Sequence, residues 1–122
     1  MKKLLFGAAL ILAFSHSVFA GVGGTGLRQI QGVGIIKTKE FGHLSNDVMQ
    51  IRVLGGFTPP SGVVCNDTTY LDTLKSVDPD RALFNLLRDA KTQRRNVLLY
   101  LTDDPTKTAS PGRCSLVAAE VL

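Results

Sequence analysis

The sequence has no tryptophan, two cysteines, two histidines and 7% aromatic residues, so several kinds of site lack their usual components. Surfaces that bind sugars or single-stranded nucleic acids usually stack their ligands on aromatic rings, and this chain has few rings from which to build one. Beyond residue 20 the single histidine is His43. One imidazole and two thiols are too few for a closed zinc site, and they offer little from which to build a nucleophile, base and acid. We therefore expect no metal, no catalytic residues and no enzyme.

Long hydrophobic runs are also missing, except near the start of the chain. A short basic stretch precedes the uncharged apolar run Leu4–Phe14, and Ala20 ends a segment of cleavage-site character. This is the pattern of a secretory signal peptide. A membrane-spanning helix needs ~20 apolar residues, more than this run provides. We expect residues 1–20 to be removed, leaving a protein exported to the periplasm or the outside of a bacterial cell, without a membrane span.

Basic residues are in small excess over acidic ones. The formal net charge is +4, and it falls to +2 once Lys2 and Lys3 leave with the signal peptide. Nucleic-acid-binding domains carry a strongly basic patch. We therefore expect no nucleic-acid partner.

Residues 21–26 read Gly-Val-Gly-Gly-Thr-Gly, which matches the Gly-x-Gly-x-x-Gly turn of dinucleotide-binding domains. That turn needs a strand before the glycines and a helix after them. Here the signal peptide comes before, and residues 27–36 suit a strand better than a helix because they are rich in glycine and β-branched residues. We expect no cofactor, a flexible glycine-rich start at residues 21–26, and a single disulfide-stapled domain over residues 27–122.

Cys65 and Cys114 are the two cysteines of the chain. A pair of cysteines in an exported domain indicates one disulfide. In the chain-entropy model, a bridge that closes a loop of this length stabilises the fold by about 4 kcal/mol. We interpret these cysteines as a structural bridge and not as a reactive site.

Apolar periodicity and turn residues divide the rest of the chain into five strands and one helix. The clearest strand has Met49, Ile51 and Val53 alternating with Gln50 and Arg52. Asp78 is expected to cap the helix, with Pro79 in its first turn. The run Val97–Leu101 is apolar on both faces, so it is expected to be a central strand. The predicted strands cover residues 27–39, 49–53, 63–71, 97–101 and 113–122, and the helix has its apolar stripe over residues 82–90.

The order of these elements, β-β-β-α-β-β, predicts an α+β, mainly β fold. It is the order of the OB-fold, a small five-stranded barrel with a helix between its third and fourth strands. An open antiparallel sheet covered by one helix has the same order. In the barrel, the third and fifth strands run side by side, so a bridge from Cys65 to Cys114 would join their matching ends.

The stretch from Cys65 to Val121 resembles small exported proteins of proteobacteria. The shared features are a cysteine, a Tyr-Leu-Asp sequence, an alanine- and leucine-rich helix, an apolar strand and a second cysteine. In this chain they are Cys65, Tyr70-Leu71-Asp72, Ala82–Ala90, Val97–Leu101 and Cys114. The resemblance implies an exported location and a fold with one disulfide. The predicted architecture is also similar to the receptor-binding B subunits of AB5 toxins, which pair an OB-fold with a disulfide and assemble into pentameric rings.

An OB-type ligand face would lie near the loops that join the first strand to the second and the fourth to the fifth. The residues predicted to surround it are Lys39, Phe41, His43, Asp103, Asp104, Lys107 and Arg113. The acidic pairs at positions 78 and 80 and at 103 and 104 lack the spacing of a calcium loop, so we interpret them as cap and turn residues.

The sequence thus predicts a small exported, non-enzymatic binding or interaction protein. Its partner would be an envelope component, a host glycan or another protein. The alternative is a ring-forming, glycan-binding or assembly subunit like the toxin B subunits, in which case the chain forms a homo-oligomer.

Overall fold

The computed structural model of the chain describes residues 21–39 and 45–122. The predicted signal peptide, and the candidate ligand residues Phe41 and His43, lie outside the described residues. The described part is mainly β, with six strands, one helix and one disulfide, so the expected α+β, mainly β class is confirmed. Within the described ranges, no helix combines the length and the apolar character needed to span a membrane.

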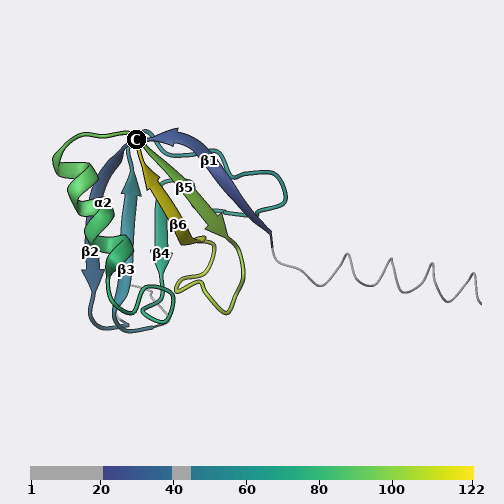
Figure 1. The fold of residues 1–122 in the computed structure, drawn as a ribbon. Helices are drawn as coiled ribbons and strands as arrows, with labels where there is room; N and C mark the ends of the chain where they lie inside the picture. The colour runs from purple at the N-terminus through teal and green to yellow at the C-terminus, as the bar shows by residue number, and fades with distance from the viewer. Residues whose placement is uncertain (1–20, 40–44) are drawn as a thin grey trace, which may run out of the picture.

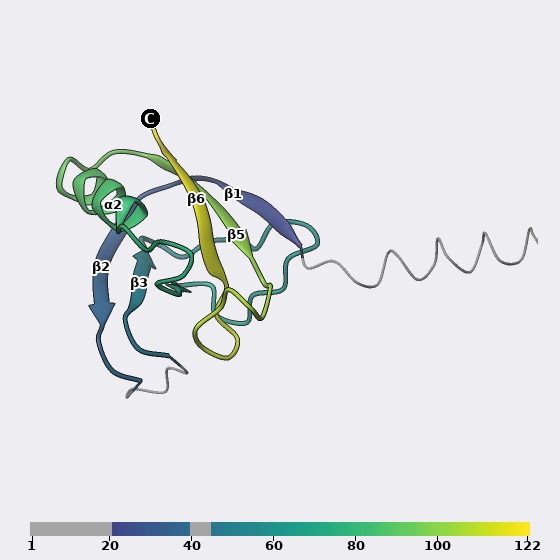
Figure 2. The same cartoon turned by 60° about the horizontal axis from the view of Figure 1, so that its bottom comes forward.

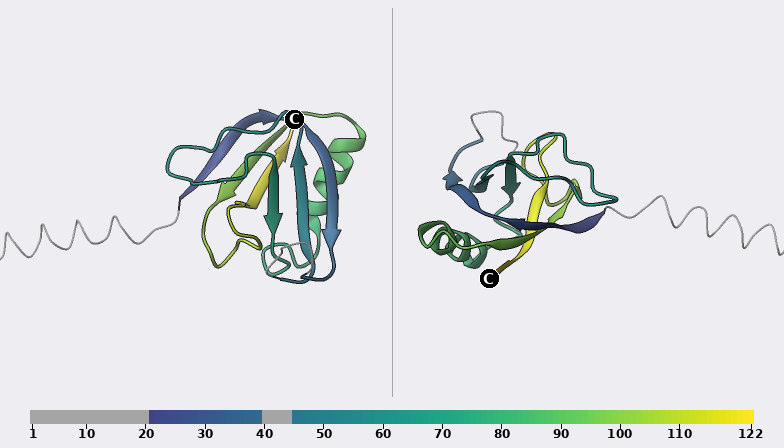
Figure 3. Two further views of the ribbon diagram at one scale, coloured as in Figure 1. Left: turned by 180° about the vertical axis from the view of Figure 1, so that it is seen from behind. Right: turned by 90° about the horizontal axis from the view of Figure 1, so that it is seen from above.

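The strands are β1 (Val22–Arg28), β2 (Ile30–Ile36), β3 (Val48–Val53), β4 (Tyr70–Thr73), β5 (Val97–Thr102) and β6 (Ser115–Val121). They form two antiparallel sheets, ordered β1-β5-β6 and β2-β3-β4. Helix α2 (Ala82–Thr92) packs against β2 and β6 (Figure 1). Seen from below, α2 lies to one side of the strands (Figure 2). Seen from behind, β6 of the first sheet lies next to β4 of the second (Figure 3).

The core lies between the two sheets and α2. The alternation predicted for β3 is confirmed, because Met49, Ile51 and Val53 are fully buried while Arg52 is exposed. The prediction of a central strand is confirmed as well, since β5 lies between β1 and β6. Fully buried side chains from both sheets and from the helix meet in this core, among them Ile51, Leu71, Leu87, Leu99 and Leu116.

The structure places most of the segment 21–26, expected to be a flexible start, in a paired strand. Residues 22–26 belong to β1, where Val22 pairs with Thr102 and Gly24 with Tyr100. Glycine and threonine give this stretch little apolar alternation, so the sequence carries no local strand signal. Pairing with β5, about 75 residues later in the chain, makes it a strand instead.

The five-stranded OB-like arrangement is not confirmed. The described residues form six strands in two sheets, and strand pairing does not join these sheets into a closed barrel. The single predicted strand 27–39 begins earlier, and Gln29 divides it into β1 and β2. The predicted strand 63–71 is reduced to Tyr70–Thr73, because its first residues, including Cys65, lie in a loop.

Asp78 caps the helix, although it lies further along the chain from the first helical residue than expected. The helix begins at Ala82, so Asp78 is not its N-cap residue. Its two carboxylate oxygens nevertheless accept hydrogen bonds from the amides of Leu83 and Phe84, both at 3.0 Å. These amides lie in the first turn, where N–H groups have no partner inside the helix. The carboxylate is buried and therefore fixes the start of α2 against the core.

We expect Asp78→Ala to lower the free energy of unfolding by about 1–2 kcal/mol, because two amides lose their acceptor. Urea denaturation followed by circular dichroism measures this loss. Asp80→Ala is the control, since Asp80 is exposed and accepts a single 3.2 Å bond from Ala82. Equal losses in the two variants would contradict the capping role of Asp78.

Candidate functional site

The outer face of sheet β2-β3-β4 carries polar side chains from two strands. On β3, Gln50 is half-buried and Arg52 is exposed. Strand pairing places Gln50 opposite Asp72 and Arg52 opposite Tyr70. Directly opposed residues share one face of a sheet, so these four side chains form a single polar patch.

Arg113 covers this patch from the loop that precedes β6. Its Nη1 donates to Asp72 Oδ2 and to Gln50 Oε1, each at 3.1 Å. Its Nε donates to Asp67 Oδ2 at 3.0 Å. One guanidinium therefore joins two carboxylates and an amide that come from three segments of the chain. We call this group the Arg113 cluster, and its members are Gln50, Arg52, Asp67, Tyr70, Asp72 and Arg113.

Two guanidinium groups contact the Tyr70 ring. The Cζ atom of Arg113 lies 4.6 Å from the ring centroid, and that of Arg52 lies 5.6 Å from it. Both distances are in the range of cation–π interactions. The Nε and Nη1 groups of Arg113 donate to partners inside the cluster, whereas the Arg52 side chain is exposed. Arg52 is therefore the member best placed to offer N–H donors to an incoming group.

Asp72 is the fully buried member of the cluster. Its carboxylate is fully buried, accepts a 2.6 Å hydrogen bond from the Ser110 hydroxyl, and pairs with Arg113. A buried charge is tolerated when it is paired and hydrogen-bonded in this way. The Asp72 amide also donates to the carbonyl of Cys114 at 3.1 Å. Backbone and side-chain bonds together fix the loop that carries Arg113 onto β4.

The predicted disulfide between Cys65 and Cys114 is present, with 5.4 Å between its Cα atoms. Arg113 directly precedes Cys114, and Asp67 follows shortly after Cys65. The Asp67 amide donates to the carbonyl of Gly112 at 2.9 Å. The bridge therefore holds together the two loops that supply the Arg113–Asp67 ion pair, so it stabilises the cluster as well as the fold.

Both partners of this ion pair favour their charged forms. Burial by itself would raise the pKa of Asp67, but hydrogen bonds from the amides of Thr69 and Tyr70 and from Arg113 outweigh it, so the pKa lies below its usual 3.8. Burial would lower the pKa of Arg113, and the carboxylates of Asp72 and Asp67 instead raise it above its ordinary value. The pair is therefore ionised throughout the physiological pH range.

The lowered pKa makes the contribution of Asp67 dependent on pH. Since the pKa is lower in the folded state, the stabilisation is fully present above the unfolded pKa of about 3.9 and is lost as the pH falls through the folded pKa. We expect Asp67→Asn to reduce the free energy of unfolding by about 1 kcal/mol at neutral pH, with the difference from wild type shrinking below about pH 4. Urea denaturation at a series of pH values measures this.

Asp89→Asn is the matched control for that experiment, because the Asp89 side chain is 65% exposed and its ion pair with Arg88 lies on the surface of α2. Its difference from wild type should be small at every pH. A difference between wild type and Asp67→Asn that stays constant down to about pH 2 would contradict the assigned pKa shift.

Two glycines leave the neighbouring part of this face bare. Gly32 pairs with Arg52, and Gly34 pairs with Gln50. A Cβ atom on Gly34 would meet no other atom within 4 Å, and one on Gly32 would approach the Cβ of Arg52 at 3.5 Å. The space above β2 is therefore open, and it borders the exposed Arg52 side chain.

The structure brings together two of the residues predicted for a ligand face, Arg113 and Asp103. They line one shallow hollow of about 310 Å³. The Asp103 carboxylate accepts hydrogen bonds from the amides of Gly21 at 3.0 Å and Val64 at 2.9 Å. It therefore attaches the start of β1 and a surface loop to the end of β5.

Lys39, Asp104 and Lys107 lie apart from the Arg113 cluster. Asp104 accepts bonds from the amide and hydroxyl of Thr106, which shape a turn and lower its pKa. The Lys107 amide donates to the Asp104 carbonyl in that turn, and the Lys39 amide donates to the Asn46 side chain.

Apart from Arg113, the members of the cluster were not among the residues predicted from the sequence. Two signals bear on them. Alternation along residues 49–53 sets Gln50 and Arg52 on the polar face of a strand, and Tyr70 and Asp72 alternate in the same way around Leu71. What the sequence does not contain is the pairing of these two strands, which makes the four positions neighbours.

In the part of the chain that the structure describes, no three His, Cys, Asp or Glu side chains gather closely enough to hold a metal ion. The chain matches no protein-family model, no curated protein and no solved structure with which it was compared.

Proposed function

We propose that this chain is a small exported, non-enzymatic binding protein whose ligand contacts the outer face of sheet β2-β3-β4 at the Arg113 cluster. One observation carries the proposal: Arg52 is exposed and lies against Tyr70. Both belong to a cluster that is fixed by the ion pair between Arg113 and the buried Asp72. Contact with the Tyr70 ring restricts the Arg52 side chain, which reduces the conformational entropy that it loses on binding a ligand.

The chemistry of this surface suits a ligand rich in hydrogen-bond acceptors. Arg52 offers several N–H donors, and the bare backbone around Gly34 lets a ligand approach β2 closely. Hydroxyl, carbonyl and carboxylate oxygens are the acceptors that a guanidinium recognises. An envelope glycan, a host glycan or a protein segment presents such groups, and glycans have the highest density of them.

An array of bacterial and host glycans tests this function, using labelled protein purified from the periplasm of an expression host. We expect wild-type protein to bind a subset of the glycans and Arg52→Ala to weaken that binding at least about tenfold, the loss of one charge-assisted contact. Arg88→Ala is the control, because Arg88 is a partly exposed arginine of α2. Equal binding by wild type and Arg52→Ala would contradict the assigned surface.

For the fold, we propose that the two sheets are the halves of an OB-like arrangement. In support, Gln29 is the single residue between β1 and β2, so these strands can act as one bent strand shared by both sheets. Helix α2 follows β4 in the chain, as the OB order requires. The bond from the Asp72 amide to the Cys114 carbonyl links β4 to the residue before β6. Slow hydrogen exchange of the Asp72 amide would support this link.

Self-assembly into a ring, as in the toxin B subunits that the predicted architecture resembles, is a second candidate. It is favoured by exposed apolar side chains on sheet β1-β5-β6: Val22 is 62% exposed, Leu27 52% and Tyr100 37%. Exposed apolar patches mark protein interfaces. Native mass spectrometry distinguishes the candidates, since a pentamer would support assembly and a monomer at micromolar concentration would contradict it.

A further inference from the structure

A second hollow lies where β1 passes into β2, at one end of sheet β2-β3-β4. It has a volume of about 570 Å³, within the range of sites that bind small molecules. Of the described residues that line it, one is basic and none is acidic. The lining includes Arg28, Gln29, Phe57, Thr58, Thr68 and Asn96. We call it the Arg28 pocket.

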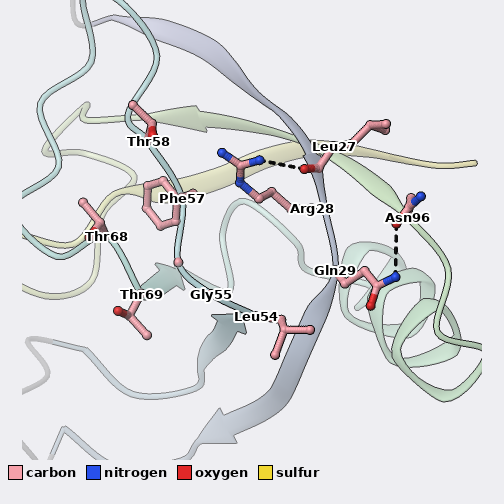
Figure 4. Close-up of a pocket in the computed structure, with 11 residues that line it drawn as sticks. Leu27, Arg28, Gln29, Leu54, Gly55, Phe57, Thr58, Thr68, Thr69 and Asn96 are labelled. Carbon is pink, nitrogen blue, oxygen red and sulfur yellow. Dashed lines mark hydrogen bonds between the residues drawn. The ribbon is translucent and has the colours of Figure 1, made fainter.

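Arg28 carries the one charge of this lining. Figure 4 shows its side chain extending from the end of β1 toward the Phe57 ring. Its Nη1 donates to the carbonyl of Leu27, the adjacent residue, at 2.7 Å. Its Nε is buried and has no hydrogen-bond acceptor among the described residues. Buried donors without a partner are rare in proteins, and each calls for an explanation.

The remaining lining supplies uncharged polar groups around the guanidinium. Thr58 and Thr68 offer hydroxyls on one side of the pocket (Figure 4). On the other side, the Gln29 amide donates to Asn96 at 3.2 Å. This combination of one cation with neutral donors and no carboxylate favours an anionic group over a cationic one.

We propose that the Arg28 pocket binds the carboxylate of a small acidic ligand or terminal group. The Nε–H of an arginine and one Nη–H form a fork that matches the two oxygens of a carboxylate. The present bond of Arg28 is to the carbonyl of its own neighbour in the chain, and binding would require a rotation of the side chain that turns the fork into the pocket. A bound carboxylate would give the buried Nε its missing acceptor.

This inference rests on the proposed binding function and adds the chemistry of the ligand. A third hollow, of about 630 Å³, is lined by Asp67 and Arg113 of the Arg113 cluster. It shares Thr68 and Thr69 with the lining of the Arg28 pocket. A ligand held at the Arg113 cluster can therefore reach the Arg28 pocket along this shared segment. Among the ligands that the Arg113 cluster accepts, the Arg28 pocket would then favour those that carry a carboxylate.

Nuclear magnetic resonance of ¹⁵N-labelled protein tests the inference directly, because the Arg28 Nε–H gives its own signal. The probes are glucuronate, an acidic sugar, and triglycine with a free carboxyl terminus. Glucose and triglycinamide are their neutral counterparts. We expect an acidic probe to shift the Arg28 Nε–H signal and the Gly55 amide in a saturable way, and its neutral counterpart to shift them at least about tenfold less. The probe that saturates identifies the source of the carboxylate as a sugar or a chain terminus.

Variants separate this inference from the proposed function. Arg28→Ala should abolish the shift at Gly55, while Arg52→Ala should leave it in place. The absence of a saturable shift with both acidic probes, or equal shifts with the neutral probes, would overturn the carboxylate site. Loss of glycan binding in Arg52→Ala would stand whether or not Arg28 responds, so the two proposals fail separately.

Discussion

Replacing both Cys65 and Cys114 with alanine is expected to lower the free energy of unfolding by about 4 kcal/mol. The bridge joins residues that are 49 positions apart, and in the chain-entropy model a closed loop of this length restricts the unfolded chain by that amount. Small domains have total stabilities of about 5–15 kcal/mol. The variant should therefore unfold at a much lower urea concentration, which circular dichroism measures.

Reduced wild-type protein is the matched control for the double alanine variant. Adding a reductant should destabilise wild type by a similar amount and leave the variant unchanged, because the variant has no bridge to reduce. A wild-type protein whose urea midpoint is the same with and without reductant, under conditions where the thiols are shown to be free, would contradict the stabilising role of the disulfide.

Arg113→Ala has the second largest expected effect, a loss of about 3 kcal/mol. Removing Arg113 takes a counter-charge away from the Asp72 carboxylate, which has no exposed surface. Asp67 and Gln50 lose a donor in the same substitution. The Arg113 side chain is 25% exposed, so water reaches the site and the loss falls at the lower end of the range for buried pairs. Thermal and urea denaturation both measure it.

A second substitution shows whether the buried Asp72 carboxylate causes this loss of stability. Arg113→Ala combined with Asp72→Asn should be more stable than Arg113→Ala alone, because a neutral amide needs no counter-charge. A double variant whose loss equals the sum of the two single losses would show that Arg113 and Asp72 do not interact energetically. Arg88→Ala on the surface of α2 should change stability by less than about 0.5 kcal/mol.

The elements that the sequence predicted correctly are those with strong local signals. Alternation identified β3, a continuous apolar run identified β5 as central, and the acidic residue at position 78 marked the start of α2. The elements it misplaced have weak local signals. The sequence of the glycine-rich β1 predicts a loop, and that of residues 63–69 predicts a strand although these residues lie outside the strands of the structure.

The candidate site could be predicted from the sequence only in part. Arg113 was identified because it adjoins the loop between the last two predicted strands, and the cysteine pair was identified from its number and context. Asp67 and Asp72 carry no local sign that a guanidinium more than 40 residues later pairs with them. Likewise, nothing around Arg28 in the sequence indicates a buried Nε without an acceptor.

The sequence by itself determined the class of the fold, the disulfide, the central strand and the polarity of the two faces of β3. These features follow from composition and from periods of two or about four residues, which act between near neighbours in the chain. The tertiary structure alone decided that β1 is a strand, that the strands form two sheets, and that Arg113 meets Asp67, Tyr70 and Asp72. The physical reason is that backbone pairing and burial of charge depend on which distant segments meet, and local periodicity does not specify that choice.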